Sequence, residues 1–264
     1  MLKTGSEEEI VLEAAACITS SVFRAVERRG FCTLVLSGGN SPRKLYRLLA
    51  EGVPASALQA REIQFPTDAV IMSQGMPRAA LPWQSIMLFW GDERCVPAGH
   101  ADSNHRMARE TLIAAADIPE KNIFPMPHVT GNYNVAAEFY EKELKRFFER
   151  QKQSANHSFP VFDIIILGMG GDGHTASLFP EDRAALEETD RWVLPVHAPH
   201  GSPPGYRLSL TLPVINSARS VLFFVTGEKK EKMVRDITSG HRPDLPAALV
   251  KPKHGELVWF YGKE

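Results

Sequence analysis

The sequence predicts an α/β fold, in which a doubly wound, mostly parallel β-sheet carries helices on both faces in a Rossmann-like arrangement. Short apolar runs such as FCTLVL and SIMLFW are typical of strands that are buried on both faces of a sheet. Between these runs, apolar residues recur with the period of an amphipathic helix, and this alternation favours a parallel sheet. The 264 residues are enough for one large core, so we expect a single domain over residues 1–264.

The first helix is predicted from its cap. Ser6 fits the N-cap position and Glu9 the N3 position, and together they form a capping box. The periodic segment Ile10–Arg28 follows, and we expect this helix to end before Gly30. The buried strand Phe31–Leu36 comes next.

Proline marks the next boundaries. Pro42 fits the first position of a second helix that runs to about Ala50. Residues 52–82 contain four prolines and little periodicity, so we predict that most of this segment is loop. The remaining elements are expected in this order: strand Ser85–Trp90, helix Asp102–Ala116 with Asp102 or Ser103 as its cap, short strand Asn122–Met126, helix Asn132–Gln151, strands Val161–Leu167, Trp192–Val196, Tyr206–Leu212 and Val221–Val225, a lysine-rich helix from Gly227 to Thr238, and strand Leu257–Tyr261.

Composition excludes several classes of protein. The net charge of −1 and the absence of a long basic run argue against a nucleic-acid partner. The cysteines are few and odd in number (Cys17, Cys32 and Cys95), which argues against a disulfide framework and for a reducing compartment. No run of about 18 apolar residues predicts a membrane span, and the acidic N-terminus lacks the apolar core of a secretory signal. We therefore expect a cytoplasmic protein with no membrane partner.

Three polar turns follow predicted strands directly. They are Ser37–Ser41, Gly91–Arg94 and Gly168–His174. In open α/β sheets, ligands bind at the edge formed by the carboxyl ends of the strands. We therefore predict that these turns meet at that edge and form the active site.

The first of these turns suits an anion. The residues Ser37, Gly38, Gly39, Asn40 and Ser41 lie between a strand and a helix N-terminus, where backbone N–H groups and hydroxyls can bind a phosphate. The turn is not a P-loop, because no Gly-Lys-Ser/Thr follows it.

The third turn carries a histidine and an aspartate. His174 has no obvious structural duty there, and histidine is the side chain best suited to move protons near neutral pH. Two roles for Asp172 stay open. Its carboxylate either caps a short helix that includes Thr175, or it orients His174 or a neighbouring cation.

The same turn matches the dinucleotide motif G-x-G-x-x-G, but its surroundings disfavour NAD binding. Pro180 limits any following helix to about two turns, whereas a dinucleotide unit needs a full crossover helix. The next predicted strand ends at His197 rather than at an acid that could bind ribose. We expect no nucleotide cofactor.

Candidate cations are Arg94, Arg207 and Lys230. Arg94 could hold a carboxylate or phosphate with two parallel hydrogen bonds. Arg207 and Lys230 could equally be ordinary surface cations. The close pair His197 and His200 lacks a third ligand, so no metal site is expected.

Six motifs together resemble the 6-phosphogluconolactonase family. They are LSGGNSPRKLY, FWGDERCVP followed by DSNHRMA, ILGMGGDGHTASLFP, RLSLTLPVINSAR, VTGEKKEKM and PAALV, in the family's order over residues 31–250. The segment DGHTASLFP separates the lactonases from the related glucosamine-6-phosphate deaminases, in which this turn reads DGHIAFNEP.

The resemblance implies hydrolysis of 6-phosphoglucono-1,5-lactone to 6-phosphogluconate, in the oxidative pentose phosphate pathway, without a metal or cofactor. It implies that His174 is the general base and that Asp172 and Arg94 lie beside the reacting atoms. On the same basis, the substrate-binding residues are Ser37, Gly38, Gly39, Asn40, Ser41, Asp92, Gly171, Arg207 and Lys230, with Lys229 as the alternative to Lys230.

Two departures and two alternatives accompany this resemblance. Asn40 replaces the usual hydroxyl residue, and residues 61–82 are longer than the usual link. One alternative is a deaminase or isomerase of amino-sugar phosphates, which would need a further acid near His174. The other is a sugar-phosphate sensor without activity. The resemblance implies that the chain binds a small sugar phosphate. We expect the protein to be a monomer or weak homo-oligomer.

Overall fold

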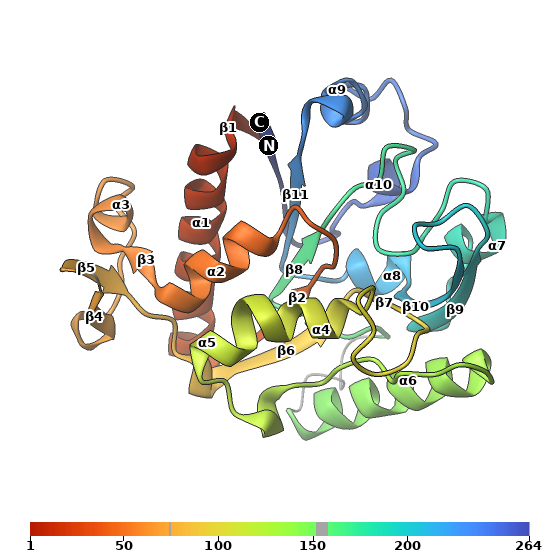
Figure 1. Cartoon of the computed structure of the whole chain (residues 1–264), viewed down its shortest axis with the longest axis horizontal. Helices are drawn as coiled ribbons and strands as arrows, with labels where there is room; N and C mark the ends of the chain where they lie inside the picture. The colour runs from red at the N-terminus through yellow and green to blue at the C-terminus, as the bar shows by residue number, and fades with distance from the viewer. Residues whose placement is uncertain (74, 152–157, 264) are drawn as a thin grey trace.

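A six-stranded sheet forms the centre of the molecule. The computed structural model describes residues 1–73, 75–151 and 158–263, and its central strands lie in the order β1-β12-β11-β8-β2-β6 (Figure 1). Each neighbouring pair is parallel. In that spatial order, the strands are β1 (Leu2–Ser6), β12 (Glu256–Lys263), β11 (Ser220–Thr226), β8 (Ile164–Leu167), β2 (Cys32–Leu36) and β6 (Ile86–Trp90).

Both faces of this sheet are covered. Neighbouring residues of a strand point to opposite faces, and all residues of β2 and β8 are buried. Helix α6 (Tyr133–Arg150) packs the ring of Phe147 5.2 Å from that of Phe89 in β6. These features confirm the predicted α/β class with its parallel sheet.

Helix α1 (Glu7–Arg29) carries the predicted capping box. The Ser6 hydroxyl accepts a hydrogen bond from the N–H of Glu9 at 3.3 Å, and the Glu9 carboxylate accepts one from the N–H of Ser6 at 2.9 Å. At the other end, Gly30 adopts a left-handed φ of 78° and donates its N–H to the carbonyl of Val26. Local side-chain chemistry therefore sets both ends of α1.

The other described helices are shorter. Ser103, one of the two predicted caps, accepts a hydrogen bond from the N–H of Arg106 at 3.1 Å. A π-helical segment, Arg109–Ile113, interrupts the predicted helix Asp102–Ala116. The helices are α2 (Arg43–Glu51), α3 (Ala55–Gln59), α4 (Asn104–Ala108), α5 (Ala114–Ala116), α7 (Arg183–Leu186), α8 (Leu212–Ile215), α9 (Glu231–Thr238) and α10 (Pro246–Leu249), with 3₁₀ turns at Thr67–Ala69, Trp83–Ser85, Glu120–Asn122 and Glu228–Lys230.

Two predicted strands lie outside the parallel sheet. Strands β9 (Val193–Ala198) and β10 (Gly205–Leu210) pair antiparallel, and β7 (Asp92–Arg94) pairs antiparallel with the other side of β10. The connection between β9 and β10 is too short for the crossover that parallel strands need. The segment Asp92–Arg94, predicted as a turn, is therefore an edge strand.

The prediction of loop for residues 52–82 was wrong. This segment forms a small antiparallel sheet, with order β3-β5-β4, from β3 (Val53–Pro54), β4 (Val70–Ser73) and β5 (Met76–Ala79), together with α3. These strands are two to four residues long, and no residue of β4 is buried. Such short strands leave no alternation of apolar and polar residues for a sequence pattern to reveal.

Three further local details differ from what the sequence suggested. Strand β1 was not predicted, although Leu2 pairs with Trp259 of β12. The predicted strand Asn122–Met126 is only an isolated bridge between Ile123 and Leu88. No helix follows His174, because residues 175–178 form a turn closed by the Leu178 N–H and the Thr175 carbonyl at 2.9 Å.

Candidate active site

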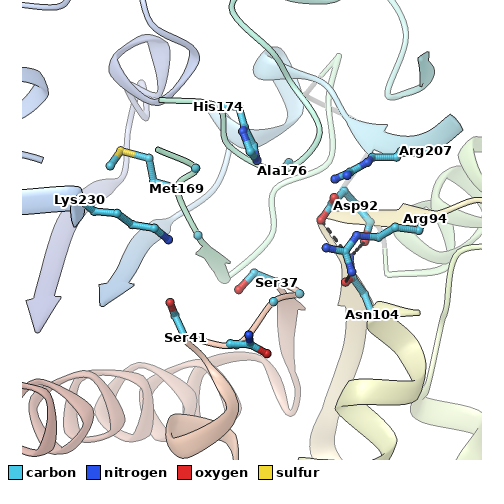
Figure 2. A pocket seen from close by; sticks show the side chains of 15 residues that line it. Ser37, Ser41, Asp92, Arg94, Asn104, Met169, His174, Ala176, Arg207 and Lys230 are labelled. Carbon is cyan, nitrogen blue, oxygen red and sulfur yellow. Dashed lines mark hydrogen bonds between the residues drawn. The ribbon is translucent and has the colours of Figure 1, made fainter. Parts of the chain in front are cut away.

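The three predicted turns meet at one cleft of about 190 Å³, at the carboxyl ends of the central strands (Figure 2). Of the predicted site residues, those that line the cleft are Ser37, Gly38, Gly39, Asn40, Ser41, Asp92, Arg94, His174, Arg207 and Lys230. Gly171 and Asp172 are not among the described lining residues. The lining also includes residues that were not predicted: Asn104, Gly168, Met169, Gly170 and Ala176.

Hydrogen bonds to residues outside the cleft lining fix the turn Ser37–Ser41, which follows β2. The N–H of Ser37 donates to the Tyr46 hydroxyl at 2.9 Å, and that hydroxyl donates back to the Ser37 carbonyl at 2.8 Å. On the far side of the turn, Ser41 Oγ accepts a hydrogen bond from Thr226 at 2.9 Å. The buried Ser37 Oγ has no partner among the described residues, so one hydroxyl of this turn is unused by the protein.

Asn104 connects the first turn to the second. Its amide oxygen accepts a hydrogen bond from Arg94 Nη1 at 2.8 Å, and its amide nitrogen donates to the Asp92 carbonyl at 2.9 Å. A Cβ on Gly38 would lie 1.8 Å from that oxygen. Glycine at position 38 therefore makes room for the Asn104 amide against the turn. The sequence signals near this residue were the cap at Ser103 and the motif DSNHRMA, which contains Asn104 but gave it no role.

Glu93 positions Asn104 from the protein interior. Its side chain, in a residue that is 1 % exposed, accepts backbone hydrogen bonds from Asn104 at 2.7 Å, His105 at 2.8 Å and Arg94 at 2.8 Å. The hydroxyl of Ser103 donates to the same carboxylate at 3.1 Å. Burial raises the pKa of Glu93 above its usual value, although these backbone hydrogen bonds lower it. The carboxylate thus fixes the start of α4 behind the cleft.

Asp92 connects the second turn to the third. Its carboxylate accepts a hydrogen bond from Ser177 Oγ at 2.6 Å, and the N–H of Ser177 donates to Ser209 Oγ at 3.2 Å. All three residues are buried. This chain of hydrogen bonds holds β7, β10 and the segment after His174 in one arrangement.

Two arginines occupy directly opposed positions on neighbouring strands. Arg94 of β7 pairs with Arg207 of β10, and like charges placed this way repel. Arg207 is 4 % exposed, and burial lowers the pKa of its guanidinium. Its Nη2 donates to the Pro203 carbonyl at 3.1 Å. The buried Nε atoms of both arginines lack partners among the described residues, so an anion in the cleft would relieve their repulsion.

His174 is oriented by Asp172. Nδ1 of His174 lies 2.6 Å from Asp172 Oδ1, and the same oxygen accepts the backbone N–H of His174 at 3.1 Å. A Cβ on Gly170 would lie 2.2 Å from Nδ1, so the imidazole packs on bare backbone. Of the two roles left open for Asp172, these contacts support the orienting one. Burial raises the pKa of Asp172, but the hydrogen bonds from His174 outweigh it, and the pKa falls below its usual value.

His174 and Arg207 lie against the same aromatic ring. The His174 ring is centred 4.6 Å from that of Phe179, and the Arg207 guanidinium lies 5.5 Å from the same centre. Figure 2 shows Lys230 entering the cleft from the side opposite Arg94 and Arg207, with the Ser37–Ser41 turn between them. Burial lowers the pKa of Lys230. Lys229 is absent from the described lining of the cleft.

Comparison with known proteins agrees with this geometry. Residues 5–259 match the family model described as glucosamine-6-phosphate isomerases/6-phosphogluconolactonase. The chain belongs to this family. A 6-phosphogluconolactonase of Synechocystis is 40% identical over 97% of this chain and 93% of its own length. The human 6-phosphogluconolactonase is 36% identical over 96% of this chain and 84% of its own.

Solved structures of family members share the fold. The 6-phosphogluconolactonase of Thermotoga maritima superposes with a TM-score of 0.74 at 29% identity and covers 100% of this chain and 99% of that one. The enzyme of Trypanosoma cruzi gives 0.76 at 29% identity, over 100% of this chain and 94% of its own. The resemblance stated from the motifs is therefore confirmed.

The described parts of the chain contain neither a cluster of metal ligands nor a membrane-spanning helix. Within residues 1–73, 75–151 and 158–263, no group of three His, Cys, Asp or Glu side chains could hold a metal ion. In the same ranges, no helix is both long and apolar enough to span a membrane.

Proposed function

We propose that this chain hydrolyses 6-phosphoglucono-1,5-lactone to 6-phosphogluconate, in the oxidative pentose phosphate pathway. The observation that carries the proposal is the arrangement of the cleft, in which an oriented histidine faces a group of cations. Relatives that align over nearly the whole chain bear the name 6-phosphogluconolactonase. A lactone that carries a phosphate offers both an electrophilic carbon and an anion for these two features.

His174 acts as the general base. Because Nδ1 faces Asp172, Nε2 is left to accept a proton from a water molecule that attacks C1 of the lactone. The bond from C1 to the ring oxygen then breaks, and the imidazolium returns its proton to that oxygen. Positioned proton transfer of this kind supplies about 10²–10⁴-fold in rate. Water is the only co-reactant, so atoms and charges balance.

We assign Arg94 as a donor to the oxyanion that develops at C1, because the family resemblance implies that it lies beside the reacting atoms and because it lines the cleft. Its Nη1 is engaged by Asn104 and by the carbonyl of Asp102, which holds the guanidinium in place. Within the glycine turn, the N–H groups of Gly170 and Gly173 are already bonded, so a further donor would come from Gly168, which lines the cleft, or from Gly171. One well-placed donor is worth about 3–4 kcal/mol in the transition state.

The phosphate group sits over the Ser37–Ser41 turn. Lys230 flanks this turn on one side, and Arg94 and Arg207 flank it on the other (Figure 2). His174 lies across the cleft from the turn in the same view. Binding the phosphate at one end of the sugar would hold C1 at the other end, beside His174, and so reduce the entropy cost of reaction.

The decisive experiment is a coupled assay that generates the lactone in situ. We expect His174→Ala to lose most of the enzyme-dependent rate while its affinity for 6-phosphogluconate stays nearly unchanged. Unchanged turnover in this variant would reject the general-base role. Release of ammonia from glucosamine 6-phosphate would instead support the deaminase alternative, although residues 175–179 supply no acid for that chemistry.

We propose further that the enzyme works in the cytoplasm as a monomer or weak homo-oligomer. Its three cysteines are free thiols, which suits a reducing compartment. Light scattering coupled to size-exclusion chromatography measures the oligomeric state directly, and a stable tetramer would contradict this proposal.

A further inference from the structure

A second charged cavity lies at the opposite edge of the central sheet from the candidate active site. It measures about 260 Å³, and its walls come from the end of α1, the residue before β8, the loop before β11 and the segment before β12. These segments meet at the amino ends of the central strands. The cavity shares no described residue with the cleft that holds His174, so the proposed lactonase reaction does not use it.

Positive charge dominates this cavity. Four arginines line it: Arg24, Arg28, Arg29 and Arg219. The carboxylates that line it are Asp163 and Glu256, and His254 lies beside them. With His254 neutral, the lining has two more positive than negative charges, although the whole chain has a net charge of −1.

Asp163 is already committed to holding two of the arginines. It is 4 % exposed, and one carboxylate oxygen accepts hydrogen bonds from the N–H and hydroxyl of Thr33 at 2.9 Å and 3.0 Å. The other oxygen pairs with Arg29 and lies 3.3 Å from Nε of Arg219. The buried Asp163 carboxylate thus holds both guanidiniums in place, and with them the N–H groups that do not contact it.

The backbone that carries Arg219 is also fixed. Its N–H donates to the Phe162 carbonyl at 2.8 Å, and its carbonyl accepts from the N–H of Glu256 at 2.9 Å. A Cβ on Gly255 would lie 2.2 Å from the Ala218 carbonyl oxygen, so these two segments pack backbone to backbone. The cavity is therefore preorganised rather than formed by a flexible loop.

Arg24 and Arg28 have no acidic partner among the described residues. They lie one helical turn apart on α1, where like charges repel, and the contact shown for Arg24 is with the Ser21 hydroxyl at 3.3 Å. The helix dipole favours a positive charge in the last turn of α1, which accounts for Arg28. The dipole does not account for Arg24, one turn earlier, or for Arg219 on a separate segment.

We propose that this cavity binds a compact polyphosphate anion, namely a diphosphate or the diphosphate group of a small molecule. Arginine guanidiniums match phosphate oxygens with two parallel hydrogen bonds, and two neighbouring phosphates would satisfy the excess positive charge. The cavity measures about 260 Å³, and its guanidiniums come from two separate segments, α1 and the loop before β11, as contacts to two neighbouring phosphates require.

Calorimetric titration of the full chain with inorganic pyrophosphate tests this proposal. The candidate active site also binds phosphates, so we expect two sites in the wild-type protein. The double variant Arg24→Ala/Arg28→Ala should weaken one site by about tenfold or more, because two charge-assisted contacts are lost, and Lys230→Ala should weaken the other. Both arginines are exposed on α1, so the fold is expected to survive their removal.

The matched control is Arg235→Ala/Arg242→Ala, which removes two exposed arginines from elsewhere on the molecule. It should leave both sites unchanged. A single site that only Lys230→Ala weakens, or two sites that Arg24→Ala/Arg28→Ala does not affect, would overturn the proposal. Equal affinity of the cavity for orthophosphate and pyrophosphate would overturn the assignment to diphosphates. Lactonase activity is measured separately, so failure of either proposal can be recognised without the other.

Discussion

One carboxylate oxygen of Asp172 contacts both the ring nitrogen Nδ1 and the backbone N–H of His174, at 2.6 Å and 3.1 Å. The two contacts fix the rotation of the imidazole and favour a proton on Nδ1. A neutral imidazole in that tautomer presents Nε2 as a proton acceptor. This geometry supports the general-base role that we propose for His174.

We predict that Asp172→Asn lowers kcat by about tenfold to a hundredfold, a part of what positioned proton transfer supplies. The amide cannot stabilise the imidazolium that forms during reaction, but it leaves the phosphate contacts intact, so KM should change little. Steady-state kinetics in the coupled assay measures both values. A change confined to KM would indicate that Asp172 binds substrate rather than positioning His174.

The lowered pKa of Asp172 also makes a prediction about stability. A carboxyl group with a depressed pKa in the folded state stabilises the protein above its unfolded pKa, and this contribution is lost as the pH falls through the folded value. The difference in free energy of unfolding between the wild type and Asp172→Asn should therefore shrink as the pH falls below about 4, where an unfolded aspartate takes up a proton. Urea denaturation at a series of pH values checks this. The side chain is half exposed, so the effect should be small.

Asn104→Ala should lower kcat/KM by about tenfold or more, the scale expected when a positioned donor is released. The variant frees Arg94 Nη1 from one of its two acceptors and removes the amide that bonds the Asp92 carbonyl. Asn122→Ala is the matched control, because Asn122 is equally buried and also donates to backbone carbonyls, but away from the cleft. If both variants lose activity in proportion to lost stability, Asn104 has no role in positioning Arg94.

Arg207→Ala and Lys230→Ala should each raise KM by about tenfold, because each removes a charge-assisted contact to the phosphate while leaving His174 in place. Lys229→Ala is the comparison for Lys230, since the neighbouring lysine is not part of the described cleft lining. Its KM should match that of the wild type. A larger effect of Lys229→Ala than of Lys230→Ala would reverse the assignment between them.

Predictions succeeded where the deciding interactions are local. The capping box of Ser6 and Glu9, the glycine that ends α1 and the buried strands β2, β6 and β8 depend on neighbours a few residues away. Likewise, the polar turns after these strands meet because the carboxyl ends of parallel strands share one edge. The sequence by itself therefore determined the fold class, the edge that carries the cleft and the family to which the motifs belong.

Tertiary structure alone decided how these parts are joined. Asn104 entered the site through contacts with Arg94, Asp92 and Gly38, and the nearest of these is ten residues away in the chain. The pairing of β10 with β7 also brings Arg207 opposite Arg94 across a long stretch of sequence. A hydrogen-bonding side chain carries no local sign of which distant partner it will meet, because that choice depends on burial and pairing of the whole sheet.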